Sequence, residues 1–185
     1  MKGDWGPQQY PQVPGHEIAG VVTAVGKNVT KFKVGDHAGV GCMVDSCLTC
    51  ESCKRGEEQH CDNGATIFTY GYSDNTSPGG ITHGGYADKI VVREHFAVKI
   101  PTTIRLQDAA LLLCAGITTY SPLIKASIKK GDKVGVAGIG GLGHMAIKLA
   151  KTRGAEVYAF TTSRDRELSE GLGCIGHEPR LRTCQ

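Results

Sequence analysis

Residues 133–144 read Lys-Val-Gly-Val-Ala-Gly-Ile-Gly-Gly-Leu-Gly-His, and this stretch decides the fold. Its opening apolar run predicts a short buried strand over 133–137, and the glycines that follow match the pattern G-x-G-x-x-G. Residues 144–153 predict a helix that ends before Gly154, and residues 156–160 predict a second strand. Strand, glycine turn, helix and strand form a βαβ unit, so the sequence predicts a parallel sheet.

A glycine turn between a strand and a helix is typical of a dinucleotide site. Glycines allow the tight turn and let the backbone approach a pyrophosphate at the helix N-terminus. The competing interpretation is a glycine-rich turn that binds nothing, because glycine makes up 26 of the 185 residues. The strand-to-helix context favours the nucleotide site. The cofactor contacts that it predicts in the turn are Gly138, Ile139, Gly140, Gly141, Leu142 and Gly143.

The end of the second strand selects between the two nicotinamide cofactors. An NAD site would place Asp or Glu about 20 residues after the glycines, to hold the ribose 2′-hydroxyl. This chain carries hydroxyl and guanidinium side chains there, and these suit a 2′-phosphate that a carboxylate would repel. The alternative is that Arg164 and Arg166 are solvated surface charges. The sequence favours NADP(H), with these predicted contacts: Thr161, Thr162, Ser163, Arg164 and Arg166.

Upstream of the βαβ unit the chain is rich in turns and β-branched residues. Residues 18–25 and 85–92 predict strands, whereas residues 108–114 and 116–123 predict helices that bridge the two halves. The two textures of sequence meet near residues 121–128.

The pattern as a whole predicts a mixed α/β protein of two domains. We expect a β-rich domain over residues 1–122 and a nucleotide-binding domain, a doubly wound parallel sheet, over residues 123–185. From about residue 167 the tail does not read as the next helix and strand of such a sheet. We therefore expect the second domain to be truncated, because a doubly wound sheet needs several more strands.

Four cysteines with metal-ligand spacing form the sharpest signal in the chain. The pattern is Cys47-x2-Cys50-x2-Cys53-x7-Cys61, and a chain that turns tightly around zinc supplies thiolates at such spacing. Four ligands leave no open coordination position, which predicts a structural ion. Disulfides and an iron–sulfur cluster are the competing interpretations. Cys42, just upstream, is interpreted as a small buried residue.

Composition excludes several classes of function. The net charge of +3 is too small to indicate a nucleic-acid or membrane-surface partner. The basic residues around the cysteine cluster number too few for a nucleic-acid module. The longest apolar run, Ala109 to Ala115, is far shorter than the roughly 20 residues of a membrane span. Bunched cysteines and an opening segment without a signal-peptide pattern predict a protein of the reducing cytoplasm.

His16, Glu17 and Cys114 each have an ordinary structural interpretation when taken alone. The motifs around them favour a functional interpretation instead. Residues 10–17 (Tyr-Pro-Gln-Val-Pro-Gly-His-Glu), the cysteine cluster and Gly-Gly-Tyr-Ala at 84–87 together resemble the zinc-dependent medium-chain alcohol dehydrogenases. Residues 112–123 (Leu-Leu-Cys-Ala-Gly-Ile-Thr-Thr-Tyr-Ser-Pro-Leu) and the glycine loop narrow the resemblance to the cinnamyl alcohol dehydrogenase group.

This resemblance implies a GroES-like catalytic domain followed by a Rossmann domain, with the active site between them. It implies that His16 and Cys114 hold a catalytic zinc, with Glu17 as an alternative ligand, and that the cysteine cluster holds a structural zinc. Thr118 would join the NADP contacts, and Trp5 would lie at the substrate cleft. Zinc would act as a Lewis acid on the oxygen of an alcohol or aldehyde while hydride passes to or from the nicotinamide. An intact family member would be a homodimer.

The resemblance also implies parts that these 185 residues do not contain. The family has a further cysteine ligand of the catalytic zinc ahead of the position of Trp5, and it has a longer Rossmann domain. We therefore expect little dehydrogenase activity from the chain as written. Two interpretations stay open: an NADP(H)-dependent alcohol dehydrogenase or aldehyde reductase, complete or as a fragment, and an inactive, zinc-stapled remnant of such an enzyme.

Overall fold

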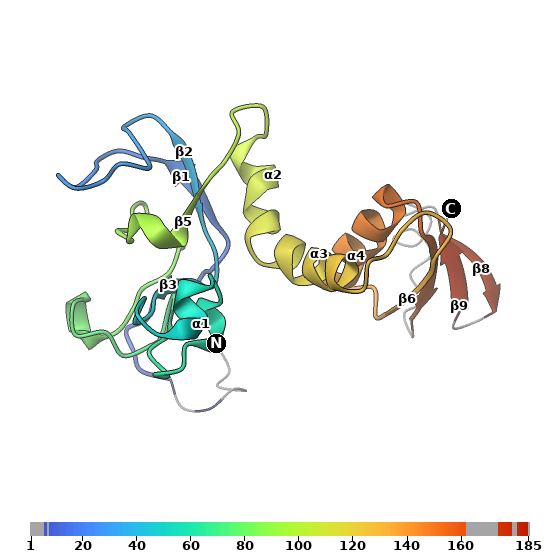
Figure 1. The fold of residues 1–185 in the computed structure, drawn as a ribbon, viewed down its shortest axis with the longest axis horizontal. Coiled ribbons are helices and arrows are strands. Elements are labelled where there is room, and N and C mark those ends of the chain that lie inside the picture. The colour runs from blue at the N-terminus through green and yellow to red at the C-terminus, as the bar shows by residue number, and fades with distance from the viewer. Residues whose placement is uncertain (1–5, 7, 162–173, 179–180, 185) are drawn as a thin grey trace. The chain divides into compact units, whose positions relative to one another are not determined.

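The chain forms two compact units, Met1–Cys114 and Ala115–Gln185. The computed structural model describes residues 6, 8–161, 174–178 and 181–184, the last two ranges by their backbone alone. Figure 1 follows the chain through its helices and strands. The sequence-based boundary at residues 122/123 falls inside helix α3 (Ala115–Lys125), and the division into domains stays a prediction.

The first unit is built from short elements joined by turns. Its 3-10 helices carry the label η. The elements are β1 (Ile18–Val21), β2 (His37–Val40), β3 (Met43–Asp45), α1 (Glu51–Lys54), η1 (Glu58–His60), β4 (Ile67–Phe68), η2 (Pro78–Gly80), η3 (Glu94–Phe96), β5 (Ala97–Lys99), α2 (Leu106–Ala110) and η4 (Leu111–Leu113).

Two antiparallel sheets organise this unit. One sheet has the order β1-β2-β5, and the other pairs β3 with β4. In the first sheet Val40 lies opposite Ile18 on one side and Ala97 on the other. Val40 and Ala97 are buried together with Phe32, and this cluster forms the core of the unit. Burial of such apolar side chains is the main force that holds a small sheet together.

The strand predicted over residues 85–92 is wrong for the described part of the chain. Backbone amides of residues 84–86 donate to carbonyl oxygens of residues 13–15, but residues 87–92 pair with no described strand. β-Branched residues indicate strand-like character without showing whether a neighbour can satisfy the backbone groups. Together with β1, these residues instead border an apolar groove of about 530 Å³. β1 itself ends at Val21 rather than at residue 25.

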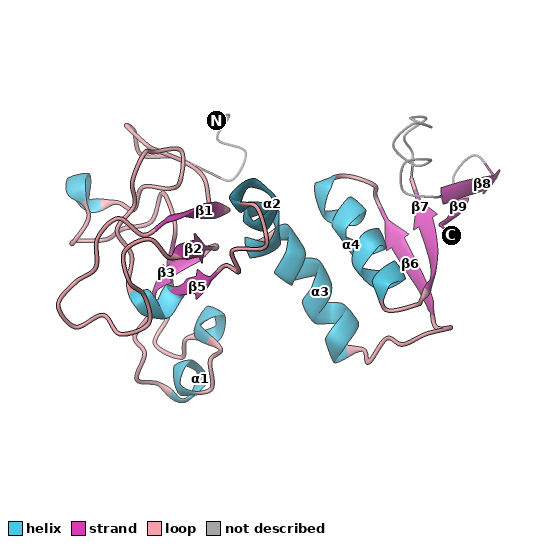
Figure 2. Ribbon diagram, turned by 90° about the horizontal axis from the view of Figure 1, so that it is seen from above, coloured by secondary structure: helices cyan, strands magenta, loops and turns pink. Residues whose placement is uncertain are grey.

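The second unit contains the predicted βαβ arrangement, with bounds close to those expected. Strands β6 and β7 are parallel, with Val134 opposite Val157, and α4 covers one face of them (Figure 2). The fully buried Ile147 and Ala150 of α4 pack with the strands and with Leu123 of α3. No described helix is both long and apolar enough to cross a membrane. The elements after α3 are β6 (Lys133–Ala137), α4 (Gly141–Thr152), β7 (Glu156–Phe160), β8 (Cys174–Glu178) and β9 (Leu181–Cys184).

The described part of the tail forms two strands, although its sequence shows no strand periodicity and does not read as the next helix and strand of a doubly wound sheet. β9 pairs antiparallel with β7, and β8 pairs antiparallel with β9, so the described sheet has the order β6-β7-β9-β8. Backbone hydrogen bonds at the edge of β7 can be satisfied by an extended segment whatever its side-chain pattern. The side-chain pattern of the tail therefore carried little information about its pairing.

Candidate metal centres and cofactor site

The four cysteines of the sequence cluster converge. Their Sγ atoms all lie within 4.8 Å of one another, with Cys47 to Cys53 at 3.8 Å, Cys50 to Cys61 at 4.0 Å and Cys47 to Cys61 at 3.5 Å. Sulfurs about 2.3 Å from one zinc ion at the corners of a tetrahedron would be about 3.8 Å apart. The separations therefore fit a single ion. A disulfide would bring two sulfurs to about 2.05 Å, and the cysteines whose side chains are described are free thiols.

Local backbone structure creates this arrangement. Leu48 adopts φ 56°, which turns the chain back between Cys47 and Cys50. Cys50 caps helix α1, and its sulfur accepts the amides of Cys53 and Asp62. Amide donors directed at a sulfur stabilise its thiolate, which is the form that binds metal.

The amide donors lower the thiol pKa at some of the four cysteines but not at all of them. Backbone amides of Thr49 and Cys50 lower the pKa of Cys47 to about 5, and a backbone hydrogen bond at Cys47 lowers the pKa of Cys61. At Cys53 the Ser46 hydroxyl acts to lower the pKa, but burial and hydrogen bonds to neighbouring thiols outweigh it and raise the pKa to about 11. The backbone amides thus favour the thiolate form at Cys47 and Cys61.

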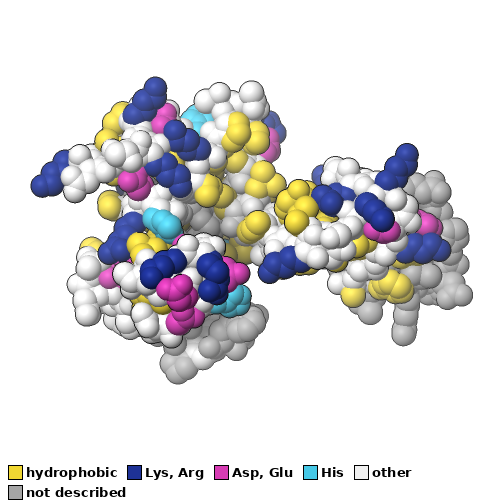
Figure 3. Space-filling model, viewed as in Figure 1, with side chains coloured by type: hydrophobic (Ala, Val, Ile, Leu, Met, Phe, Trp, Pro, Cys, Tyr) yellow, Lys and Arg dark blue, Asp and Glu magenta, His cyan; other side chains and the backbone are white. Residues whose placement is uncertain are grey.

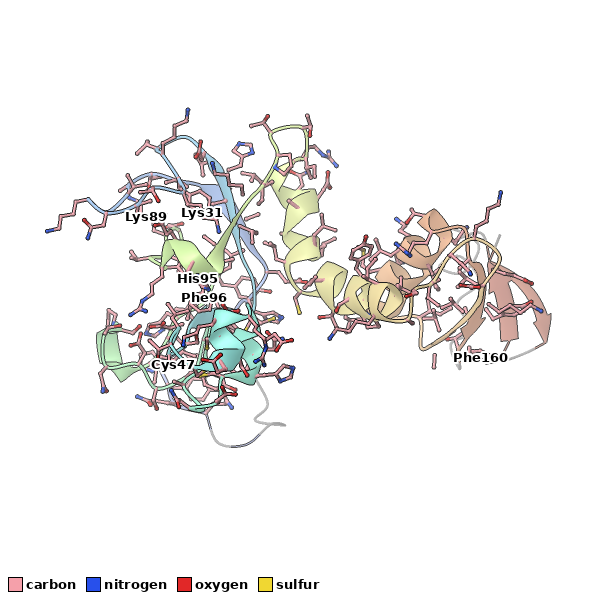
Figure 4. The ribbon with its side chains drawn as sticks, viewed as in Figure 1. Lys31, Cys47, Lys89, His95, Phe96 and Phe160 are labelled. Atoms are coloured by element: carbon pink, nitrogen blue, oxygen red, sulfur yellow. The ribbon has the colours of Figure 1, made fainter. Side chains whose placement is uncertain are left out.

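The segment that carries the cluster, residues 47–61, is called the lobe below, and a side-chain contact joins it to the rest of the unit. Glu58 of η1 is largely buried and lies 2.6 Å from His95 of η3, and this hydrogen bond lowers the pKa of Glu58. Figure 4 labels Cys47 in this lobe and His95 on η3. Because η3 leads directly into β5, the pair connects the lobe to the first sheet.

The surface of the lobe carries charges of both signs. Lys54 pairs with Glu51 at 2.9 Å, and Arg55 pairs with Glu57 at 3.1 Å. Dark blue and magenta side chains lie next to one another over α1 in Figure 3.

A second cluster of ligand atoms lies in the same unit. His16, Cys42 and Cys114 place one ligand atom each within 4.8 Å of the other two, and all three residues are half-buried. One imidazole and two thiols form a donor set that suits zinc with a fourth position left open. The predicted residues His16 and Cys114 are thus brought together from distant parts of the chain. Cys42 lies with them, although its position in the sequence was interpreted as that of a small buried residue.

Glu17 belongs to the electrostatic surroundings of this cluster. The pKa of Cys42 is raised to about 12, first by burial, then by a hydrogen bond and charge from Cys114, and then by the charge of Glu17. Glu17 is therefore close enough to act on the cluster electrostatically. Its predicted role as an alternative zinc ligand stays a prediction.

Glycines allow the three ligand-bearing segments to approach. A Cβ on Gly41 would lie 2.7 Å from the carbonyl oxygen of Leu113, so only glycine admits the turn that carries Cys114. Likewise a Cβ on Gly84 would lie 2.2 Å from the carbonyl oxygen of Gly15, next to His16. Gly84 of the sequence motif is thus explained by backbone contact beside the histidine, whereas a Cβ on Gly85 would meet the side chain of Ile18.

The glycine loop has the geometry that a nucleotide requires. Gly138 adopts φ 84° at the end of β6, and a Cβ on Gly143 would lie 1.9 Å from the carbonyl oxygen of Gly138. A Cβ on Gly140 or Gly141 would meet nothing within 4 Å, so the loop is open on that side. The first helical hydrogen bond runs from the His144 amide to the Gly140 carbonyl. The preceding amides at the start of α4 are therefore left for an anion.

Of the other predicted cofactor and substrate residues, the structure describes two, Thr118 and Thr161. Thr118 is exposed on α3, which packs against α4, and Thr161 follows directly after β7. The remaining predicted contacts lie outside the described residues: Trp5, Thr162, Ser163, Arg164 and Arg166.

Comparison with known proteins decides the family. Residues 1–102 match the alcohol dehydrogenase GroES-like domain. The chain belongs to the alcohol dehydrogenases with this domain. The recognition of the medium-chain alcohol dehydrogenases and their cinnamyl group is confirmed, as is the expected fold class of a GroES-like unit followed by a Rossmann unit.

Three relatives illustrate the similarity of this alcohol dehydrogenase chain. It is 53% identical over 172 residues to NADP-dependent alcohol dehydrogenase C 1 of Mycolicibacterium smegmatis, which covers 93% of this chain and 48% of that protein. The crystal structure of CAD from Helicobacter pylori complexed with NADP(H) matches with a TM-score of 0.84 and 48% identity, over 90% of this chain and 48% of the other. A cinnamyl alcohol dehydrogenase from Sorghum bicolor matches with a TM-score of 0.86 and 48% identity, over 93% and 48%. The chain thus spans about half the length of these relatives.

Sequence reasoning missed two residues of the second cluster's surroundings. Cys42 lies between β2 and β3. Its carbonyl accepts the amide of Thr69, whose hydroxyl also donates to the Gly41 carbonyl. The ring of Tyr70 stacks on His16 with 6.1 Å between centroids. The motif spacing carries no signal for either contact, because both depend on how β4 folds back on β3.

Proposed function

We propose that this chain supplies the metal-binding unit and the start of the cofactor-binding unit of an NADP(H)-dependent alcohol dehydrogenase or aldehyde reductase. The observation that carries the proposal is the approach of His16 to Cys114 in a chain that also forms a glycine loop between a parallel strand and a helix. An open zinc site and a dinucleotide loop are the two parts that hydride transfer to or from an alcohol carbon requires.

The two metal centres would have different roles. The four cysteines fill every position of a tetrahedral zinc and would stabilise the lobe. His16 and Cys114, with Glu17 nearby, would hold a zinc that keeps a position open for substrate. When bound, that zinc would supply Lewis acidity toward the substrate oxygen.

The second unit would bind and orient the cofactor. Amides at the start of α4 would donate to the pyrophosphate, and the open side of Gly140 and Gly141 leaves room for it. The hydroxyl and guanidinium groups of residues 161–166 would accept the 2′-phosphate of NADP(H). Thr118 is proposed as a further contact, and Trp5 as a surface against which an aromatic or aliphatic alcohol or aldehyde would lie.

A zinc-stapled protein without turnover is the second candidate. Its supporting observation is the described sheet, in which only β6 and β7 are parallel and β9 pairs antiparallel to them. The crevice that holds a nicotinamide forms at the carboxyl ends of parallel strands. A sheet that continues antiparallel supplies less of that crevice.

The thiol chemistry supports a location in the cytoplasm. Thiolates bind zinc only when they are reduced, and reducing compartments keep clustered cysteines in that form. The oligomeric state stays a prediction from the family resemblance.

Purified protein tests both candidates. We expect little turnover from these 185 residues alone, whereas a chain completed with the remaining segments of a full-length relative should show cinnamaldehyde-dependent oxidation of NADPH. That activity should be lost in His16→Asn and kept in His60→Asn, at an exposed histidine outside the ligand clusters. NADPH should be favoured over NADH in the same assay. Two bound zinc ions per chain without measurable turnover would select the second candidate.

A further inference from the structure

Cys42 is a thiol that the proposed function leaves without a role. Its sulfur lies within 4.8 Å of the sulfur of Cys114. Both thiols are free, and both residues are half-buried. Among the described residues, the four cysteines of the lobe form a separate group. Cys42 and Cys114 are therefore a thiol pair of their own.

The backbone keeps the two cysteines side by side. Gly41 and Leu113, the residues that directly precede them, approach so closely that a Cβ on Gly41 would lie 2.7 Å from the carbonyl oxygen of Leu113. The buried Thr69 holds the other flank, because its amide donates to the carbonyl of Cys42 and its hydroxyl to the carbonyl of Gly41. The proximity of the pair is thus set by the chain and not by one side-chain rotamer.

The separation of the two sulfurs suits the formation of a disulfide. The sulfurs of a disulfide are about 2.05 Å apart, so a pair that begins within 4.8 Å can close by a change of side-chain rotamer. The backbone contact between Gly41 and Leu113 stays in place during such a change. Because the residues are half-buried, a small oxidant such as hydrogen peroxide can reach the sulfurs.

We propose that Cys42 and Cys114 form a reversible disulfide when the protein meets hydrogen peroxide. One sulfur, as its thiolate, attacks a peroxide oxygen. The O–O bond breaks, the sulfur becomes a sulfenic acid, and the thiol proton leaves with hydroxide as water. The other thiol then attacks that sulfur, so that the S–S bond forms, the S–O bond breaks and a second water leaves. The two thiols together lose two electrons and two protons, and the peroxide is reduced to water.

The disulfide would act on the proposed zinc site through Cys114. The thiolate is the form of cysteine that binds metal, and a sulfur in a disulfide carries no such charge. Oxidation of Cys114 and zinc binding by it therefore exclude each other. This consequence rests on the proposed function, whereas the disulfide itself rests only on the thiol pair. In a reducing compartment cellular thiols would reverse the link, as is usual for redox-sensing disulfides of cytosolic proteins.

Disulfide mapping tests the proposal without an activity measurement. Purified, reduced protein freed of loosely bound metal would be pulsed with hydrogen peroxide, and the remaining thiols would be blocked with N-ethylmaleimide. Mass spectrometry of a non-reducing digest then identifies each link. The link between Cys42 and Cys114 should be at least about tenfold more abundant than any link from either cysteine to the lobe, because proximity favours the intramolecular partner, and dithiothreitol should remove it. Recovery of the two as separate thiols or sulfinic acids, or links to the lobe in equal amount, would overturn the proposal.

Cys42→Ser gives the matched control. Without a second thiol to attack the sulfenic acid, Cys114 should be recovered as sulfinic acid in about tenfold larger amount than in the wild type. An unchanged amount would count against Cys42 as the partner. Before oxidation the variant should unfold at the same temperature as the wild type. Saturating zinc during the pulse should slow the wild-type link about tenfold, because a bound thiolate is less available to peroxide. If the link forms equally fast with zinc, the disulfide stands and the proposed zinc site fails.

Discussion

Replacing Thr69 with valine should destabilise the first unit. Thr69 is 1% exposed, and its hydroxyl donates to the Gly41 carbonyl. Valine has nearly the same shape, so the substitution creates little cavity, but it leaves that carbonyl without its donor. A buried acceptor left unpaired costs about 1–3 kcal/mol, and we expect a loss of about 2 kcal/mol in the free energy of unfolding.

Thr69→Ser is the matched control, because it keeps the hydroxyl and removes only a methyl group, at a cost of about 1 kcal/mol. Urea denaturation of the zinc-loaded proteins measures both losses. Equal losses in the two variants would refute the view that this buried hydrogen bond contributes to the stability of the unit.

Three other changes have outcomes that the structure fixes. Cys50→Ser should release one zinc ion per chain and unfold the lobe, since binding of a structural zinc contributes folding energy directly. Metal analysis would show the loss of zinc and limited proteolysis the unfolding, and full retention of zinc would contradict the prediction. The hydrogen bond from His95 lowers the pKa of Glu58. This pair should therefore stabilise the fold fully above the ordinary glutamate pKa of about 4.3. The contribution should be lost as the pH falls through the lowered pKa of Glu58. Glu58→Gln should remove this part of the acid-induced fall in thermal midpoint, and an unchanged pH profile would count against the pair. Ile147→Ala should lower the free energy of unfolding by about 2–5 kcal/mol, because the side chain is completely buried. Leu142→Ala, at a side chain that is half exposed, should lower it by less than about 0.5 kcal/mol. Similar losses at both positions would argue against the packing of α4.

The βαβ unit was predictable because its signals are local. The strands over 133–137 and 156–160 have the bounds that the apolar runs indicated. The helix begins at Gly141 rather than at residue 144, because the glycine turn itself forms the first helical turn. Glycine is a poor helix former, so the sequence pattern placed the start too late.

Pairing between distant segments was less predictable. Residues 85–92 have the composition of a strand, yet residues 87–92 pair with no described strand. The tail has no strand-like periodicity, yet β8 and β9 pair with the edge of β7. Strand composition is a property of the segment, whereas pairing depends on which edges are free.

The same distinction applies to the metal ligands. The convergence of the four cysteines follows from tight turns within one segment, so their spacing was informative. The grouping of Cys42 with His16 and Cys114 depends on sheet register and on close backbone contact at Gly41. No spacing rule expresses that contact, and Cys42 therefore looked like an ordinary small residue in the sequence.

The two metal centres also differ in when they can exist during synthesis. The ligand set of the lobe is complete once Cys61 has left the ribosome, whereas the second set must wait for Cys114. At about 5–20 residues per second, these events are separated by about 3–10 s. The lobe closes short loops, at a small entropic cost, and can take up its ion while the rest of the unit is still unfolded. The nascent chain would thus load its zinc ions in a fixed order, with four reactive thiols already sequestered before the open site forms.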